Sequence, residues 1–431
     1  MALEGVRVLD FTRLGFGPQA TLILGCLGAE VIRVESSLHP DGVRIIPPLI
    51  PDPGEKGEGF GGGSLAAAKG LRSFNRGGTF YKYNTGGKKS IAVNARHPEG
   101  LALLKRLVAV SDVVTESFAA GTMARWGLAY EELRRCRSDV IYVSMCGFGH
   151  EGPDGRYVTM GPTAQALTGL TFLVGLPDRP PAGWSFSYLD HVGGYLGALA
   201  VLQALHHRRK TGAGQHVDVS QLEPATALNG ALLLDFLVNG RPARRPGFPP
   251  GNRRLDPPAA PQGAYRAAGD DRWIVISCRT DEQWRGLVDA LGRPAWAQGE
   301  GLATMAGRLA HREELDARLE AWTIQQDRYQ AMHLLQAHGV PAGVVQDAAD
   351  RLERDPQLAY RGHFTTLRSR EVGELPLEGI PLAMSATPPH TGGRIRRGPP
   401  DLGEDTDAVL RQLLNLDGAE LARLRKDKVL T

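Results

Sequence analysis

Asp190 is the residue of this sequence best suited to carry out chemistry. It lies in the almost uncharged segment 184–195, at the predicted start of a long helix over residues 190–209. A helix start stabilises a negative charge, and a carboxylate kept ionised in apolar surroundings can act as a nucleophile. We expect Gly193 and Gly194 to leave room beside it for a bulky ligand. An Asp at a helix start can also serve only as an N-cap, so that structural role stays open at this point.

Two glycine-rich loops follow predicted strands, where a backbone without Cβ atoms can approach a ligand closely. Residues 15–20 (GFGPQA) open a helix and Glu35 ends the next strand, which is the spacing of a dinucleotide-binding fingerprint. Pro18 removes a backbone donor that a pyrophosphate would need. A plain glycine turn, or a helix start that faces another phosphate-bearing ligand, would therefore explain this loop equally well. Residues 146–153 (CGFGHEGP) form the second loop.

Three basic residues are candidates for binding a ligand, and Lys88 and Lys89 could form a phosphate clamp. Arg125 follows a strand expected over residues 112–115, at the edge where open sheets bind ligands. Lys88 and Lys89 follow a pair of glycines. Each of the three could equally be a solvated surface cation, and spacing alone does not decide between these roles.

Alternating strand and helix patterns are expected to position these residues, and they favour a parallel α/β sheet with helices on both faces. The predicted strands cover residues 6–11, 31–34, 90–93, 112–115, 140–144 and 215–219, and the predicted helices cover residues 19–27, 98–110, 130–136 and 190–209. Seven prolines in residues 242–261 indicate a linker. Beyond it, the patterns predict a second, smaller α+β domain.

The composition excludes several classes of protein. A length of 431 residues predicts two to three domains. The net charge of +3, without a long basic run, lacks the clustered positive charge of a nucleic-acid-binding surface. The four cysteines show no metal-ligand spacing and indicate a reducing compartment. Because no export signal or membrane-spanning stretch is found, we expect a cytoplasmic protein that binds no metal, nucleic acid or membrane.

Six short segments stand out in order along the chain. They are LEGVRVLD (3–10) with Gly17-Pro18, LGAEVIRVE (27–35), KKSIA (88–92), GFG (147–149) with Gly152-Pro153, KTGAGQ (210–215) and HGVPA (338–342). As an ordered set, they resemble the class III CoA-transferases, the carnitine dehydratase and bile-acid-inducible protein F family. Proteins of this family transfer CoA from an acyl-CoA to a free carboxylic acid, and their nucleophilic Asp matches Asp190.

The resemblance implies that CoA and acyl-CoA are substrates rather than tightly bound cofactors, and that they contact eight residues. These are Leu14, Gly15, Ser117, Phe118, Arg125, Gly147, Phe148 and Gly149. A flap over the site would correspond to residues 249–252, although two prolines replace glycines there. At Ser36 and Cys146 some transferases carry an Arg and a Lys respectively, so the CoA contacts are expected to differ in detail.

The implied architecture is a large Rossmann-like domain with a mostly parallel sheet, a small α+β domain, and two subunits threaded as interlocked rings. A homodimer is expected, and a heteromer stays open. The corresponding boundaries are 1–225 for the large domain, 226–262 for a linker, 263–350 for the small domain, and 351–431 for a return segment whose helices pack on the large domain.

The predicted reaction proceeds through an aspartyl anhydride and an aspartyl-CoA thioester, and three competing functions stay open. A racemase or isomerase of the superfamily is less favoured, because the Gly-His-Asp triplet that supplies its second base is replaced by Thr159-Met160-Gly161. His150 or His191 could replace that base only with a different geometry. The second competing function is that of a non-catalytic subunit in a heteromeric transferase. The third is an NAD-dependent oxidoreductase that uses Gly15, Gly17 and Glu35.

Overall fold

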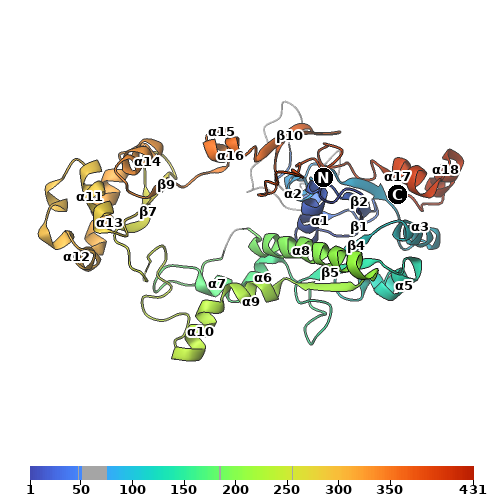
Figure 1. Ribbon diagram of the computed structural model, residues 1–431, viewed down its shortest axis with the longest axis horizontal. Helices are drawn as coiled ribbons and strands as arrows, with labels where there is room; N and C mark the ends of the chain where they lie inside the picture. Colours follow the sequence, from blue (N-terminus) through green and yellow to red (C-terminus); the bar gives the residue numbers. More distant parts are fainter. Residues whose placement is uncertain (47, 51–74, 184–185, 255) are drawn as a thin grey trace. The chain divides into compact units, whose positions relative to one another are not determined.

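Figure 1 shows the computed structural model of the chain, which describes residues 1–46, 48–50, 75–183, 186–254 and 256–431. The chain divides into two compact units, each described here by itself. Unit 1 comprises Met1–Thr171, Gly183–Leu233 and Gln357–Thr431, and unit 2 comprises Phe172–Ala182 and Leu234–Pro356. Unit 2 is therefore inserted into the sequence of unit 1. The predicted division of the chain into four segments stays a prediction.

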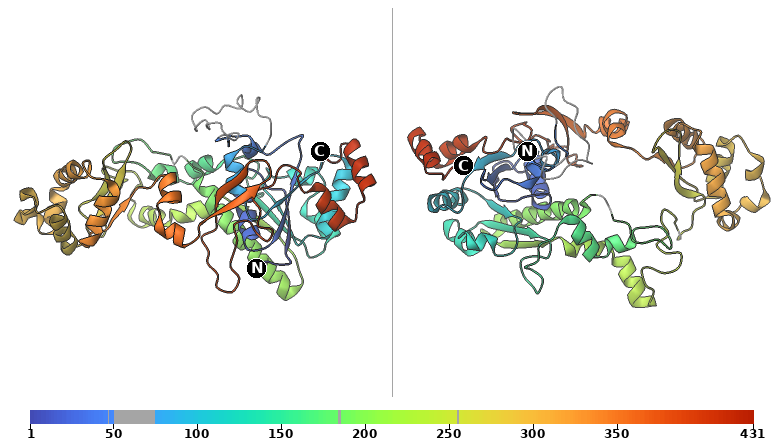
Figure 2. Two further views of the ribbon diagram at one scale, coloured as in Figure 1. Left: turned by 90° about the horizontal axis from the view of Figure 1, so that it is seen from above. Right: turned by 180° about the vertical axis from the view of Figure 1, so that it is seen from behind.

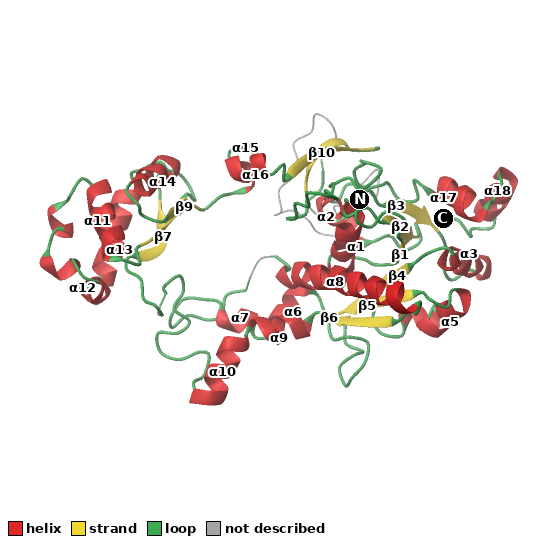
Figure 3. Cartoon of the chain, viewed as in Figure 1, coloured by secondary structure: helices red, strands yellow, loops and turns green. Residues whose placement is uncertain are grey.

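Unit 1 is built on a six-stranded sheet in which every neighbouring pair is parallel (Figure 3). Its order is β3-β2-β1-β4-β5-β6, so the chain runs outward from β1 in two directions and the topological switch point lies between β1 and β4. The predicted α/β class is confirmed. The strands are β1 Arg7–Asp10, β2 Glu30–Glu35, β3 Lys89–Ala92, β4 Val113–Glu116, β5 Ile141–Cys146 and β6 His216–Ser220.

Helices cover both faces of this sheet because successive side chains of each buried strand point to opposite faces. Val8 packs in the core under α1 (Phe16–Cys26) and α8 (Tyr188–Thr211), and Leu9 packs in the core on the other face. That second core contains α3 Pro98–Ala109, α5 Tyr130–Cys136, α17 Thr406–Leu414 and α18 Gly418–Lys426. Figure 2 shows the red C-terminal helices beside the cyan segment that includes α3.

The end of the chain completes this second core. Leu430 forms an antiparallel bridge with Val93, and the backbone N–H of Asn94 donates to the carbonyl oxygen of Val429 at 2.9 Å. The Thr431 hydroxyl lies 3.1 Å from the hydroxyl of Ser36, just after β2. The last residues are therefore part of the sheet's packing.

Glycines allow α1 and α8 to pack closely. All eleven residues of α1 are buried. A Cβ atom at Gly193 would lie 2.5 Å from Cε2 of Phe16, and one at Gly194 would lie 2.5 Å from Cγ of Gln19. The expectation that these two glycines leave room for a ligand is wrong, since side chains of α1 fill that space. No helix in the described ranges is long and apolar enough to cross a membrane.

The other elements of the chain are shorter. The antiparallel hairpin β10 Phe364–Ser369 and β11 Gly373–Glu378 lies in unit 1, and in unit 2 helices pack on one face of an antiparallel sheet. That sheet has β7 Gln262–Arg266, β8 Trp273–Ser277 and β9 Ala342–Val344. The remaining helices are α2 Gly78–Tyr83, α4 Thr122–Arg125, α6 Gly161–Leu167, α7 Leu170–Leu173, α9 Leu222–Leu228, α10 Gly230–Asn239, α11 Asp281–Ala290, α12 Met305–Ala310, α13 Arg312–Thr323, α14 Arg328–Ala337, α15 Ala348–Glu353 and α16 Pro356–Tyr360.

Replacing Gly25 by Ala is expected to lower the free energy of unfolding by about 1–3 kcal/mol, because the added methyl group overpacks the core. A Cβ at Gly25 would lie 2.4 Å from the backbone oxygen of Gly86, which has no flexible side chain to move aside. Gly230→Ala is the control, since a Cβ at this helical position would meet no atom within 4 Å. Urea denaturation followed by circular dichroism compares them, and equal midpoints would contradict the close approach.

Candidate active site

A cavity of about 90 Å³ lies where β1, β4 and β5 end, beside the switch point of the sheet. Open parallel sheets bind their ligands at this place. The loop after β1 contributes residues 13–16, the loop after β4 contributes 117–119, and the end of β5 contributes 145–147. Residues 157–161, Asp190 and Gln221 complete the lining. All of these residues belong to unit 1.

Asp190 lies in the first turn of α8, with its two carboxylate oxygens in different surroundings. Oδ1 accepts a hydrogen bond of 2.5 Å from Nε2 of Gln221. Oδ2 faces the loop after β1, and a Cβ atom at Gly15 would lie only 2.5 Å from it. Gly15 is therefore needed for the backbone of that loop to lie against the carboxylate.

Burial and local hydrogen bonds together determine the charge state of Asp190. Burial raises the pKa of the Asp190 carboxyl above its ordinary value, although hydrogen bonds from Gln221 and Ser187 oppose the shift. A helix start adds partial positive charge that favours the ionised form. The result is a carboxylate that is poorly solvated and only half-buried, which suits a nucleophile.

Residues of α6 fix the start of α8. The side-chain oxygen of the buried Gln165 accepts a hydrogen bond of 3.0 Å from the backbone N–H of Tyr188, the first residue of α8. A Cβ at Gly161 would lie 2.6 Å from Cβ of Ser187 and 3.2 Å from Oδ1 of Asp190. The turn that carries Asp190 is thus packed directly against α6.

A buried ionic cluster positions the loop after β1. Leu14 has a left-handed backbone conformation with φ of 63°, and its N–H donates to Oδ2 of Asp41 at 3.2 Å. Asp41 forms an ion pair with Arg33, which lies 3.2 Å from Glu35, and Glu35 lies 2.6 Å from Arg44. Burial alone would raise the pKa of Glu35, but Arg44 and Arg33 hold it well below its usual range. Because Glu35 is committed to these partners, it is not available to bind a ribose.

The structure brings six of the nine predicted site residues to the cavity: Asp190, Leu14, Gly15, Ser117, Phe118 and Gly147. The hydroxyl of Ser117 accepts from the backbone N–H of Arg13 at 2.8 Å, which joins the loops after β1 and β4. The ring of Phe118 packs edge-on against Trp126, with ring centres 5.0 Å apart.

Arg125, Phe148 and Gly149 lie outside the cavity lining. Arg125 is exposed at the end of α4, where Nη2 donates to the hydroxyl of Thr122 at 2.9 Å. The Phe148 ring lies 6.0 Å from that of Tyr157, and Gly149 has a positive φ of 82°.

The basic residues and histidines noted in the sequence have other roles. Lys88 is fully buried and donates to the backbone oxygens of Pro18 and Tyr83 at 3.0 and 3.1 Å, so it is neither a surface residue nor a phosphate clamp. His191 lies 3.4 Å from the hydroxyl of Tyr83. His150 lies 3.3 Å from Oε1 of Glu116. Neither histidine is among the described residues that line the cavity.

Sequence reasoning missed Gln221 and Gln165. Gln221 directly follows β6, and polar residues at the carboxyl ends of parallel strands are the signal that could have identified it. Gln165 carries no such signal, because it lies within a short helix whose neighbours the sequence does not reveal.

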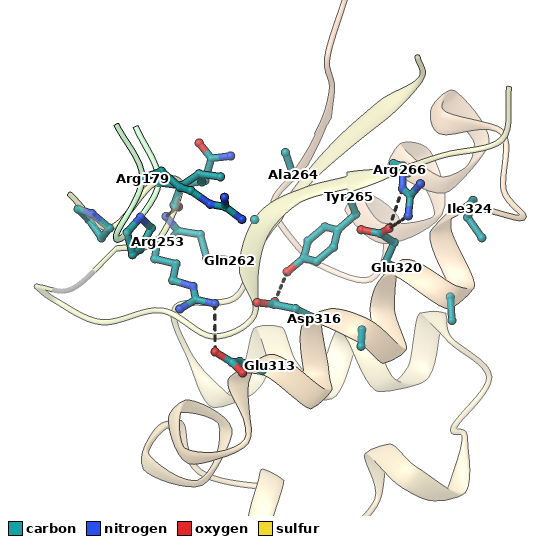
Figure 4. Close-up of a pocket in the computed structure, with 17 residues that line it drawn as sticks. Arg179, Arg253, Gln262, Ala264, Tyr265, Arg266, Glu313, Asp316, Glu320 and Ile324 are labelled. Carbon is teal, nitrogen blue, oxygen red and sulfur yellow. Dashed lines mark hydrogen bonds and ion pairs between the residues drawn. The ribbon is translucent and has the colours of Figure 1, made fainter. Parts of the chain in front are cut away.

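Unit 2 contains a larger cavity, of about 880 Å³, shown in Figure 4. Its acidic side chains come from α13 and each has a partner in the cavity. Arg266 and Glu320 lie 2.7 Å apart, the Tyr265 hydroxyl donates to Asp316 at 2.7 Å, and Arg253 lies 3.9 Å from Glu313. Pro250 and Asn252 of the predicted flap also line this cavity, and their action as a flap stays a prediction. Each carboxylate of this cavity is thus engaged by an arginine or a tyrosine.

Comparison with known proteins relates almost the whole chain to one family. Residues 3–406 match the family model described as CoA-transferase family III. A succinyl-CoA–D-citramalate CoA-transferase of Chloroflexus aurantiacus is 32% identical over 428 residues, covering 99% of this chain and 98% of that protein. The alpha subunit of a succinyl-CoA–L-malate CoA-transferase of Chloroflexus aurantiacus is 30% identical, covering 100% and 93%. The crystal structure of a CaiB/BaiF family protein from Brucella suis matches with a TM-score of 0.80 at 31% identity, covering 95% of this chain and 99% of that one.

Asp190→Asn is expected to raise the melting temperature at pH 7. Burial raises the pKa of Asp190 in the folded protein, so its ionised form destabilises the fold at every pH above that pKa. This cost disappears below the ordinary Asp pKa of about 3.9, so the gain from Asn should shrink as the pH falls towards that value. Thermal melts at several pH values measure the effect.

Asp139→Asn is the control for these melts, because it is expected to change the melting temperature in the opposite direction. The hydrogen bond from Arg137 lowers the pKa of Asp139, so its ionised form stabilises the fold at neutral pH. Its replacement should therefore lower the melting temperature at pH 7. A lower melting temperature for Asp190→Asn as well would contradict the destabilising role of the Asp190 charge.

Proposed function

The chain belongs to CoA-transferase family III, as its motifs predict, and from this premise we propose that Asp190 is the nucleophile that moves CoA from an acyl-CoA to a carboxylic acid. The observation that carries this proposal is the position of the Asp190 carboxylate. It faces a cavity walled by the loops after β1, β4 and β5. Its raised pKa and sparse hydrogen bonding favour attack on a carbonyl carbon.

The first half of the reaction loads CoA onto Asp190. A carboxylate oxygen of Asp190 attacks the thioester carbon, and the carbon–sulfur bond breaks. This step forms an aspartyl anhydride and releases CoA as its thiolate. The thiolate then attacks Cγ of Asp190, and the bond from Cγ to the bridging oxygen breaks. The donor acid departs as a carboxylate, and an aspartyl-CoA thioester remains.

The acceptor acid reverses these steps. Its carboxylate attacks Cγ and expels the CoA thiolate, which then attacks the acceptor's carbonyl carbon and releases Asp190. Both intermediates stay activated, so the energy of the thioester is conserved provided that water is excluded.

We assign the predicted CoA-binding residues to two groups. Leu14, Gly15, Ser117, Phe118 and Gly147 line the cavity and would contact acyl-CoA near its reacting atoms. Arg125, Phe148 and Gly149 lie outside it and would contact more distant parts of CoA. The exposed guanidinium of Arg125, which has no carboxylate partner among the described residues, is suited to a CoA phosphate.

We further infer that the exchanged acids are dicarboxylic. The two relatives described above act, by name, on succinyl-CoA with D-citramalate or L-malate, all of which carry a second carboxylate. Arg13 is the cationic residue among the described lining residues. A guanidinium favours a carboxylate over a neutral group.

A second subunit is part of the proposal. Tyr157, Val158 and Met160 line the cavity yet are 65%, 75% and 56% exposed. Exposed apolar side chains beside a binding site indicate a surface that a partner covers. We propose an interlocked homodimer. Because one relative is named an alpha subunit, a heteromer is the second candidate for the assembly. In that case this chain alone would bind CoA but would not catalyse transfer.

Racemase and oxidoreductase activities gain no support from the site. A racemase needs a second base, and among the described lining residues the thiol of Cys146, whose pKa burial raises to about 11, is a poor one. An NAD-dependent oxidoreductase would need Glu35, which Arg33 and Arg44 occupy.

Asp190→Ala is expected to reduce CoA exchange between acids by more than about a thousandfold, a barrier change of ~4 kcal/mol. CoA binding, measured by calorimetry, should persist because the nucleophile contributes little to it. Hydroxylamine added with acyl-CoA should inactivate the parent by trapping Asp190 as a hydroxamate, detectable by peptide mass spectrometry. Residual exchange above a thousandth of the parent rate, or trapping at another residue, would refute the assignment.

A screen of acyl-CoA donors against carboxylic acids tests the substrate class. Dicarboxylic acceptors are expected to react at least about tenfold faster than monocarboxylic acids of equal length, a difference of ~1.4 kcal/mol. Arg13→Met should reduce this preference, whereas Arg125→Met should raise KM for the acyl-CoA and leave the preference intact. Mass spectrometry of the CoA products gives the rates, and equal rates for both acid classes would exclude the dicarboxylate inference.

A further inference from the structure

Gln221 is, with Ser187, one of the two side chains that hydrogen-bond to the Asp190 carboxylate, and its own position is firmly fixed. It lies between β6 and α9 and is only 3% exposed. Its backbone N–H lies 3.0 Å from the carbonyl oxygens of both Cys146 and Gly147. The end of β5 therefore fixes the backbone from which the Gln221 side chain extends to Asp190.

The amide of Gln221 makes the two oxygens of Asp190 unequal. Nε2 donates to Oδ1 at 2.5 Å, while Oδ2 faces the glycine of the loop after β1. Gly15 and Gly161 both approach the carboxylate closely, which restricts its movement. Oδ2 is thus the oxygen without the amide partner and is the better placed to attack.

Among the described titratable side chains near Asp190, none donates a hydrogen bond to Oδ1 in place of this amide. Burial lowers the pKa of His191 to about 4 and raises that of Cys146 to about 11, so both are neutral at pH 7. Burial and the charge of Asp190 raise the pKa of Tyr83, whose hydroxyl lies 3.4 Å from His191. The guanidinium of Arg13 donates to the backbone oxygen of His39.

We propose that Gln221 is a catalytic residue that holds Asp190 with Oδ2 toward the substrate and stabilises the oxyanion that forms on Oδ1. The proposal rests on Asp190 as the nucleophile. When a thiolate or carboxylate attacks Cγ, the electron pair of the Cγ–Oδ1 double bond moves to Oδ1. The amide N–H already points at that atom. The pair returns when the bond from Cγ to the leaving group breaks, so no proton is gained or lost.

This hydrogen bond accelerates the attacks on Cγ because its strength increases along those steps. In the anhydride and in the thioester, Oδ1 is a neutral carbonyl oxygen and accepts weakly. In each tetrahedral state it bears a full negative charge, and hydrogen bonds to ionised acceptors are about twice as strong as neutral ones. Only interactions that strengthen in the transition state lower the barrier.

Gln221→Met tests the proposal, because Met keeps the length of the side chain but cannot donate. Removal of one oxyanion donor typically slows catalysis by about 10²–10³-fold. We expect a loss of that size in the rate at which enzyme mixed with acyl-CoA alone forms the aspartyl-CoA thioester, followed by intact-protein mass spectrometry. The KM for acyl-CoA should change less than about threefold, since the interaction is made in the transition state.

The pH profile supplies a second readout that a purely structural role would not move. The Gln221 hydrogen bond lowers the pKa of Asp190, so its loss should shift the acid limb of kcat/KM to higher pH. Gln221→Glu keeps the shape and adds a negative charge beside Oδ1, and it should shift the limb further. Gln165→Met is the matched control, because this buried glutamine bonds the backbone of α8 and not Asp190. It should lower thermal stability without moving the limb.

The outcomes separate this proposal from the assignment of the nucleophile. If the parent forms the thioester and both Gln221 variants form it within about threefold of the parent rate, with unchanged acid limbs, Gln221 only packs the core and the proposal is overturned. A shift of the limb in Gln165→Met equal to that in Gln221→Met would also overturn it. If the parent itself forms no thioester and hydroxylamine does not trap Asp190, the nucleophile assignment fails first.

Discussion

A poorly solvated carboxylate held at the edge of a parallel sheet is the constraint on which the rest of the site depends. A charge removed from water is costly unless fixed dipoles replace the hydration. Around Asp190 that replacement is sparse and consists of one amide, one hydroxyl and the start of α8. The backbones of Gly15 and Gly161 lie close to the carboxylate. Gly161 belongs to α6, and Gln221, which supplies the amide, directly precedes α9. The site therefore restricts the position of the Asp190 carboxylate and stabilises its negative charge with only a few hydrogen bonds.

Much of the fold could be predicted because its signals are local. Branched apolar runs alternating with helical spacing identified the strands of the large sheet and the helices that cover it. Asp190 and the glycine loops could be predicted for the same reason, since each lies where a strand ends or a helix begins. The family motifs then placed these separate features in one reaction, which periodicity alone does not do.

What could not be predicted are the contacts between segments distant in sequence. Gln221 lies 31 positions from Asp190, and nothing in either segment reveals that the two side chains meet. The interpretation of Gly193 and Gly194 failed for the same reason, because the residues that fill the space, Phe16 and Gln19, belong to α1. Glu35 fitted a nucleotide-binding spacing, yet the arginines that occupy it were not visible from that spacing.

The insertion of unit 2 into unit 1 has a consequence for biogenesis. Val93 and Ser36, which the nascent chain presents early, receive their partners Leu430 and Thr431 only after all the intervening residues have been synthesised. Domains generally fold as units, and contacts between such distant residues slow folding and expose apolar surface meanwhile. One face of the large sheet therefore lacks its final cover while the ribosome completes more than 200 further residues, from the end of β6 at Ser220 to Thr431. During this interval the unfinished chain exposes apolar surface of the kind that chaperones cover.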